Sequence, residues 1–124
     1  MTMRDSIAAA RIGDPCQAAD GATLFEFKFG AEDQTFAGHF PGHPILPGVF
    51  QLEMTRVAAE SVLNCPLSIR EIRKARFQRP ILPGETVRVE LKLSQSDGVI
   101  QARAGFSVDG QPAGETILFL WRTE

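Results

Sequence analysis

Hydrophobic and polar residues alternate along several stretches of the chain, as they do in β-strands with one buried face. The stretch TLFEFKF (residues 23–29) puts three phenylalanines on one side and a glutamate and a lysine on the other. A period of two residues is typical of a strand that packs one face against a core. Further strands are predicted at 69–77, 86–93, 99–108 and 115–121. Asp97-Gly98 and Asp109-Gly110 predict tight hairpin turns between the last three of them.

A different pattern occupies residues 49–64, between Pro47 and Pro66. Proline is tolerated in the first turn of a helix, and a proline just beyond a helix prevents its continuation. Hydrophobic residues in this segment are not confined to one stripe, which is typical of a buried helix. The sequence therefore predicts one helix from Val49 to Asn64 with apolar residues nearly all round.

The order of these elements predicts an α+β domain in which an antiparallel sheet curls around one central buried helix. Residues 6–12 (SIAAARI) fit either a short helix or an edge strand, and both alternatives stay open. No repeat or linker divides the chain, so residues 1–124 are expected to form a single domain.

Composition and charge narrow the classes of function. The 124 residues are 44% hydrophobic and 23% charged, with a formal net charge of −2, which argues against a nucleic-acid-binding surface. No apolar run reaches the roughly 18 residues of a membrane span, and the start of the chain lacks a secretory apolar core. A cytoplasmic protein is expected, with Cys16 and Cys65 as reduced thiols.

Candidate chemistry gathers in FAGHFPGHPILPGVFQLE, residues 36–53. Its prolines stiffen the backbone around His39, and Gly48 puts an N–H without a side chain at the start of the predicted helix. Glu53 has apolar neighbours one turn away on that helix, so desolvation is expected to raise its pKa. A histidine base, a carboxylic acid and an N–H donor suit removal of a proton beside a carbonyl with loss of a β-leaving group.

Each of these residues also has a structural alternative. His39 could cap backbone groups in a loop, Gly48 could serve only as a helix-start glycine, and Glu53 could pair with Arg56 three residues on. His39 and His43 have the spacing of a helical metal pair, but the prolines around them exclude a helix and no third ligand is evident. No metal site is therefore predicted, and His43 is expected on a loop surface or pocket rim.

The basic residues concentrate between positions 70 and 79. Lys74, Arg76 and Arg79 follow Arg70 and Arg73 in this stretch. They fit either a solvated strand face or a surface that attracts an acidic partner. Phe77 alone of the aromatic residues interleaves with the cluster, which makes nucleic-acid binding an unfavoured interpretation.

The motif GHFPGHPILPGVFQLE (38–53) resembles the signature of the hot-dog-fold 3-hydroxyacyl-(acyl carrier protein) dehydratases of the FabZ/FabA type. The blocks KARFQRPILPGETV (74–87) and FSVDGQPAGETILFL (106–120) are similar to later segments of that family. The resemblance covers roughly residues 35–122. It implies that His39 and Glu53 form the catalytic pair and that the Gly48 N–H polarises the thioester carbonyl.

The same resemblance implies the rest of the site. Residues expected to contact substrate are Phe40, Pro47, Val49, Phe50 and Val57, where Val57 replaces a glutamine that the family usually has. Lys74, Arg76 and Arg79 are expected to bind the acyl carrier protein, whose phosphopantetheine carries the substrate, so no further cofactor is expected. The family also implies a homodimer, possibly a higher oligomer, with active sites at the interface between subunits.

Two other functions stay open from the sequence. A hot-dog thioesterase would act on the same class of bond, and a non-catalytic subunit could bind acyl carrier protein or complete a heterodimer. The chain has no tyrosine, and its first 30 residues resemble the family poorly. These departures indicate a divergent member that could serve a specialised acyl pathway.

Overall fold

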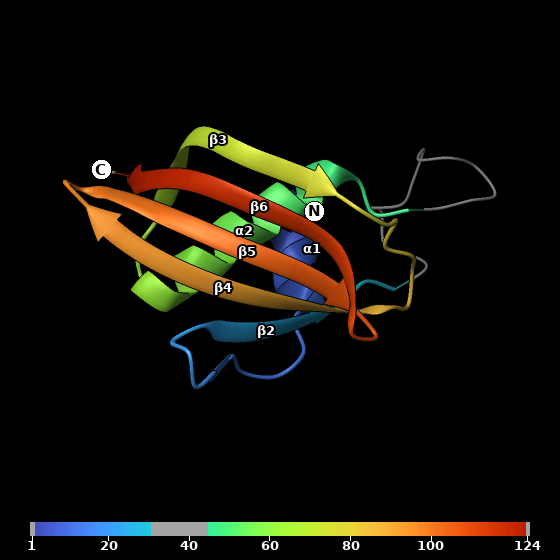
Figure 1. Cartoon of the computed structure of the whole chain (residues 1–124). Coiled ribbons are helices and arrows are strands. Elements are labelled where there is room, and N and C mark those ends of the chain that lie inside the picture. Colours follow the sequence, from blue (N-terminus) through green and yellow to red (C-terminus); the bar gives the residue numbers. More distant parts are fainter. Residues whose placement is uncertain (1, 31–44, 124) are drawn as a thin grey trace.

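The computed structural model describes residues 2–30 and 45–123, and within these ranges it contains two helices and six strands (Figure 1). The helices are α1 (Met3–Ala10) and α2 (Gly48–Leu63). The strands are β1 (Cys16–Gln17), β2 (Thr23–Lys28), β3 (Leu67–Phe77), β4 (Thr86–Ser96), β5 (Val99–Val108) and β6 (Gln111–Arg122). The α+β expectation is confirmed, and the five predicted strands are all present.

The strands form one antiparallel sheet in the order β1-β2-β4-β5-β6-β3. Both predicted hairpins are confirmed, because Ser96 pairs with Val99 and Val108 pairs with Gln111 across two-residue turns. Asp97 and Asp109 have φ values of 52°, and the glycine after each also has a positive φ. Such turns match the twist of the strands they join.

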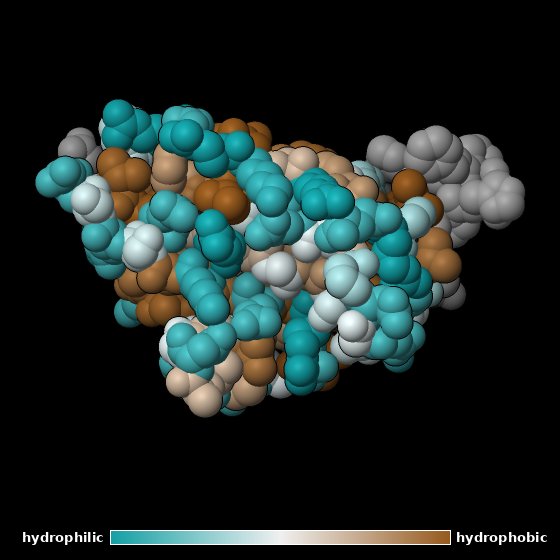
Figure 2. Space-filling view, in the orientation of Figure 1, coloured by the Kyte–Doolittle hydropathy of each residue, from teal (hydrophilic) through white to brown (hydrophobic). Residues whose placement is uncertain are grey.

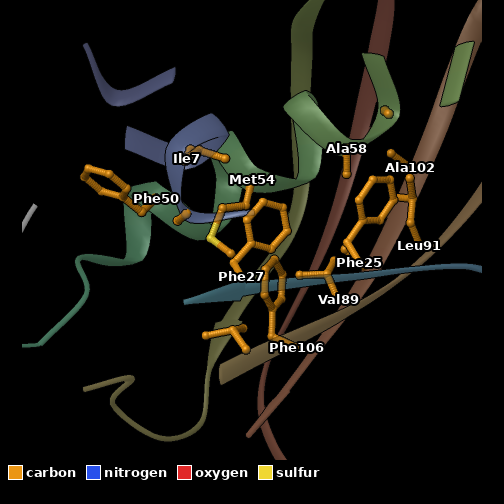
Figure 3. Packing of buried hydrophobic residues seen from close by; sticks show 14 of the residues in the cluster. Ile7, Phe25, Phe27, Phe50, Met54, Ala58, Val89, Leu91, Ala102 and Phe106 are labelled. Atoms are coloured by element: carbon orange, nitrogen blue, oxygen red, sulfur yellow. The ribbon is translucent and has the colours of Figure 1, made fainter. Parts of the chain in front are cut away.

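The core lies between the sheet and α2, with α1 packed beside α2 (Figure 3). Phe27 of β2, Met54 of α2 and Phe106 of β5 converge there, and each is at most 2% exposed. One buried polar link joins the two layers, since the hydroxyl groups of Thr55 and Thr116 lie 2.7 Å apart. The Thr55 hydroxyl also donates to the Gln51 carbonyl at 2.8 Å, so the link gives a partner mainly to the buried hydroxyl of Thr116.

The helix α2 is buried on the side that packs against the sheet and partly open on the other, so its apolar residues nearly all round are not all buried in one protomer. Its buried positions form one stripe that faces the sheet: Phe50, Gln51, Met54, Thr55, Ala58 and Ala59. Val49 and Val62 lie off this stripe and are 51% and 39% exposed. A single sheet covers one side of a helix, so the apolar residues on the opposite side of α2 remain open in the protomer.

The face of the sheet that points away from α2 is mainly hydrophilic (Figure 2). Along β4 the buried residues Val87, Val89 and Leu91 alternate with exposed charged residues. The ambiguous segment near the amino end is a helix, because Thr2 and Asp5 form a capping box at the start of α1. The two-residue strand β1 was not predicted, since two residues carry no periodicity.

The loop 78–85 ties two distant parts of the chain to the end of the sheet. The Leu46 N–H donates to the Ile81 carbonyl at 2.8 Å, just before α2 begins. The Gly84 N–H donates to the Phe29 carbonyl at 2.8 Å, just after β2 ends. Phe29 and Leu46 are therefore held by the same loop. In residues 2–30 and 45–123, neither helix is long and apolar enough to span a membrane.

Candidate functional site

The first turn of α2 is built around Gly48, as the sequence predicted. Pro47 is the N-cap residue and has no side-chain hydrogen bond to the turn. A Cβ atom placed on Gly48 would lie 2.5 Å from Cε2 of Phe77, closer than two carbons can approach. A side chain at position 48 would therefore have to displace the half-exposed ring of Phe77 at the end of β3. Because Gly48 has no side chain, the backbone at the amino end of α2 is not covered by one at its first position.

A cavity of about 260 Å³ lies beside this turn. Gly48, Phe77 and Arg79 line it, together with Ile45, Leu46, Gln51, Gln78, Pro80 and Ile81. The free N–H groups of a helix start favour oxygen atoms that carry negative charge. A cavity at the start of α2 can therefore accept a polarised carbonyl oxygen, with Arg79 at its rim.

Replacing Gly48 by alanine should disturb this turn through the ring of Phe77. We expect Gly48→Ala to lower the free energy of unfolding by about 1–3 kcal/mol, because overpacking forces the ring or the helix start to shift. In a protein that already carries Phe77→Ala, adding Gly48→Ala should cost much less stability, because the ring that the new methyl group would displace is gone. Urea denaturation of the four proteins measures this coupling. Gly105→Ala is the control, because nothing lies within 4 Å of its added Cβ, and an equal loss there would contradict the account.

Glu53 lies on α2 with its carboxyl group paired to Arg56. Nε of Arg56 donates to Oε2 of Glu53 at 3.1 Å, and Nη2 of Arg56 donates to Oε1. The side chains of Glu53 and Arg56 are 16% and 22% exposed. The apolar residues one turn away do not isolate this carboxyl, because the guanidinium of Arg56 reaches both of its oxygens. The ion pair is the structural alternative that the sequence left open for Glu53.

A second glutamate, Glu60, ties this part of α2 to the neighbouring elements. Its Oε1 accepts from Nη1 of Arg4 on α1 at 2.5 Å, and its Oε2 accepts from the Leu67 N–H at the start of β3 at 2.7 Å. Burial raises the pKa of Glu60, but the hydrogen bonds from Arg4 and Leu67 outweigh burial and hold this pKa below its ordinary value. The charges of Arg4 and Arg56 act in the same direction.

Glu60 should make the stability of the fold depend on pH. A carboxyl whose pKa is lowered in the folded state stabilises the protein above its ordinary pKa of 4.5, and that contribution is lost as the pH falls below it. Glu60→Gln should therefore cost about 1–3 kcal/mol at pH 7 and progressively less below pH 4.5. Urea denaturation across this range measures the difference. Glu90→Gln on the exposed face of β4 is the control and should change stability by less than about 0.5 kcal/mol; a cost at Glu60 that stays constant with pH would contradict the assignment.

Gly48 and Glu53 point away from each other around α2. Five residues along a helix turn the side chains by about 500°, so the two positions lie about 140° apart around the axis and about 7.5 Å apart along it. The cavity at Gly48 and the carboxyl of Glu53 thus belong to different faces of the same helix. A substrate bound in the cavity at Gly48 therefore does not face the Glu53 carboxyl of the same helix.

His39, Phe40 and His43 lie outside the described residues. The structure places the residues that flank this segment, because Phe29 and Leu46 both bond to the loop 78–85 beside the cavity at Gly48. The catalytic role of His39 and the substrate contact of Phe40 stay predictions from the sequence.

The other predicted substrate residues fall in three different surroundings. Pro47 caps α2, and Val49 is half exposed beside it. Phe50 is buried in the core, with its ring edge-on to Phe29 at a centroid distance of 6.2 Å. Its observed contribution is therefore to packing. Val57 lines a separate cavity of about 530 Å³ with Phe25, Phe27, Ala58, Ala8, Arg11, Gly13, Asp14 and Ser61.

The basic residues of β3 and the following loop are largely paired within the protomer. Lys74 lies 2.5 Å from Glu115 and Arg79 lies 2.8 Å from Glu85, whereas Arg76 is exposed. Arg70 and Arg73 stack over the rings of Trp121 and Phe119. The cluster therefore follows the solvent-facing side of β3 and β6.

The sequence analysis missed Gln51, which is 2% exposed and has a buried Oε1 without a hydrogen-bond partner in the described structure. The sequence feature that could have indicated it is a polar residue between the apolar residues of VFQL. Its Oε1 would lie 2.4 Å from a Cβ on Gly114, so that glycine makes room for the amide. Cys16 and Cys65 are free. Among the described residues, no three His, Cys, Asp or Glu side chains gather to form a metal site.

Among proteins of known name, several with sequences similar to this chain are called dehydratases. The chain is 42% identical over 84 residues to the 3-hydroxyacyl-[acyl-carrier-protein] dehydratase FabZ of Desulforamulus reducens, covering 60% of this chain and 59% of that protein. It is 36% identical over 88 residues to FabZ of Pelotomaculum thermopropionicum, covering 65% and 63%. The matched part thus spans less than two thirds of the length of these relatives.

A solved structure resembles nearly the whole chain. The dehydratase heterocomplex ApeI:P from Xenorhabdus doucetiae matches with a TM-score of 0.75 and 27% identity, covering 90% of this chain and 96% of the other. The family model described as "ApeI-like: ApeI dehydratase" matches residues 16–113, which include α2, Glu53 and the strands β1 to β5 and end near the start of β6. With its fold, its two motifs and this match, the chain belongs to the ApeI-like dehydratase family.

Proposed function

We propose that this protein dehydrates a 3-hydroxyacyl thioester, carried on acyl carrier protein, to the trans-2-enoyl thioester. The observation that carries the proposal is α2 itself, which begins at Gly48 beside a cavity and presents Glu53 five residues later. A helix start can bind the thioester carbonyl, and the Glu53 carboxyl of a second copy of the chain can act on the β-hydroxyl. FabZ relatives carry this activity in their names.

The reaction needs one base, one acid and one carbonyl-binding donor. His39 removes the α-proton, while the Gly48 N–H stabilises the negative charge that develops on the thioester oxygen. Glu53 gives a proton to the departing β-hydroxyl, which leaves as water with the electrons of the C–O bond. The double bond forms between the α and β carbons. No metal or redox group takes part in these steps, and the phosphopantetheine of the carrier protein holds the substrate.

The active site is completed by a second copy of the chain. Gly48 and Glu53 face different directions on one helix, so a substrate held at Gly48 requires a carboxyl from elsewhere. The edge strand β3 offers a surface for this partner, since it is eleven residues long and its residues from Arg70 to Phe77 are exposed. Ile72 and Phe77 on this strand are each 49% exposed. Exposed apolar side chains on a long edge strand are usually covered by another surface.

Acyl carrier protein is the proposed partner of the basic surface. Arg76 is exposed near the end of β3, and Arg79 lies at the rim of the cavity beside Gly48. A basic rim attracts an acidic carrier and its phosphate group, and increases the rate of association. The ion pair of Arg79 with Glu85 holds this side chain at the cavity, whereas Lys74 is paired with Glu115 on the sheet.

Mixing two inactive variants tests the shared site. His39→Ala and Glu53→Gln should each be inactive alone. A mixed dimer places both substitutions in one site and leaves the other site intact. Unfolding and refolding an equal mixture should therefore restore about a quarter of wild-type activity, because half of the dimers are mixed and each has one working site. A mixture as inactive as its components would show that both residues act from one protomer.

A heterodimer is the second candidate, because the Xenorhabdus doucetiae relative is found in a heterocomplex. In that case the purified chain would turn over no 3-hydroxyacyl thioester alone and would gain activity when its partner is added. Gel filtration with activity measured across the eluted fractions distinguishes the two assemblies.

A further inference from the structure

The guanidinium group of Arg56 holds the carboxyl of Glu53 more firmly than an ordinary pair on a helix surface. It donates to both oxygens of Glu53, and its Nη1 also donates to the Leu67 carbonyl at 3.0 Å. Planar bidentate contacts fix both the position and the direction of a carboxylate. Both side chains are mostly buried, at 22% and 16% exposed, so solvent weakens the pair less than it would on an open surface.

Arg56 is itself held by contacts to two elements, α2 and β3. Glu60 lies 3.6 Å from Nη1 of Arg56, and the same Glu60 carboxyl accepts from Arg4 of α1 and from the Leu67 N–H of β3. Leu67 is fully buried and is paired with Arg122 of β6. The head of Arg56 therefore cannot move without breaking contacts to Glu60 of α2 and to the Leu67 carbonyl of β3. A helix-surface pair of two flexible side chains would have no such support.

We propose that Arg56 is a positioning residue of the dehydration reaction, which orients the Glu53 carboxyl and stabilises the negative charge that it gains on giving up its proton. This inference rests on the proposed function. When the β-hydroxyl leaves, the O–H bond of the Glu53 carboxyl breaks and its electron pair stays on the carboxylate beside Arg56. The proton leaves in water, and the α-proton held on His39 returns to Glu53 to complete the cycle.

Steady-state kinetics of Arg56→Ala test this role, with Arg4→Ala as the matched control. Both substitutions remove an arginine from the same network, but Arg4 contacts Glu60 and not Glu53. We expect Arg56→Ala to lower kcat by about 10- to 100-fold with KM changed less than about threefold. Arg4→Ala should keep kcat within about twofold of wild type. Equal kcat values for the two variants would overturn the proposal.

Chemical rescue separates positioning from loss of structure. Low millimolar guanidinium chloride should raise the kcat of Arg56→Ala, and the same concentration of sodium chloride should not. A kcat that responds equally to both salts would overturn the proposal. If Arg56→Ala does not fold, Arg56→Lys replaces it, because lysine keeps the charge but cannot reach both oxygens of Glu53 and the Leu67 carbonyl together. Its kcat should fall by about 5- to 10-fold, and an unchanged kcat would overturn the proposal. An inactive wild-type protein would instead refute the proposed function.

Discussion

Replacing Glu53 with glutamine is expected to lower kcat for dehydration at least about 100-fold while the protein stays folded. Glutamine keeps the size of the side chain and can still contact Arg56, but it has no acidic proton to give to the departing hydroxyl. His39→Ala should cause a loss of similar size, because the α-proton then has no base. Formation of the enoyl thioester by each purified variant measures the effect.

Two controls make this result specific to the site. Glu90→Gln is the same substitution on the exposed face of β4 and should leave kcat within about twofold of wild type. The circular dichroism spectrum and the thermal unfolding curve of Glu53→Gln should resemble those of the wild type, because Arg56 keeps its contacts to Leu67 and Glu60. This shows that the variant is folded. A folded Glu53→Gln protein with wild-type kcat would show that this carboxyl has only a structural role.

Phe106→Ala should destabilise the fold by about 3–5 kcal/mol, the range found when a large buried side chain leaves a cavity. Phe106 is 2% exposed and lies between Val89 of β4 and Gly114 of β6, facing Met54 and Phe27 in the core (Figure 3). The close packing of these rings against α2 leaves little room for the site to collapse. Urea denaturation at one fixed protein concentration measures the loss.

Phe119→Ala is the matched control for this prediction. Phe119 lies on the neighbouring strand β6, only partly buried, with its ring under Arg73 on the outer face of the sheet. Its loss should cost about 1 kcal/mol or less, because little apolar area is exposed to water by the change. Equal losses for the two substitutions would contradict the position of the core between the sheet and α2.

The strands and hairpins could be predicted because their signals are local. Alternation in TVRVELKL and the Asp-Gly turns each specify one structure almost independently of the rest of the chain. The segment 6–12 could not be settled, because a seven-residue run carries too little periodicity; the capping box of Thr2 and Asp5 lies outside it. The N-cap residue and the first turn of this short helix contain the information that the run itself lacks.

The surroundings of Glu53 depended on contacts between distant parts of the chain. Its neighbours on the helix are apolar, and from these alone a carboxyl without a partner is expected. The Leu67 carbonyl accepts a hydrogen bond from Arg56 and so orients its guanidinium toward Glu53. The position of that carbonyl is fixed by the pairing of β3 with β6. The sequence therefore supplied the pairing with Arg56 as one alternative, and the fold shows that this ion pair forms, while the catalytic role of Glu53 stays a prediction.

The exposed side of α2 illustrates a similar limit. An apolar helix predicts burial, but the sequence pattern does not say whether the covering surface belongs to the same protomer. The sheet covers the stripe that contains Met54 and leaves Val49 and Val62 open. The open positions lie on the same helix as Gly48 and Glu53, where a second copy of the chain is proposed to complete the site.

The most direct test is a single reaction of the wild-type protein with 3-hydroxyacyl-(acyl carrier protein), in which two products are measured together. Absorbance of the conjugated enoyl thioester reports dehydration, and a thiol reagent reports hydrolysis of the thioester bond. The account predicts that enoyl thioester accumulates to an equilibrium that is also reached from the enoyl side, with no thiol released. Release of thiol without any enoyl thioester would contradict it and identify a thioesterase.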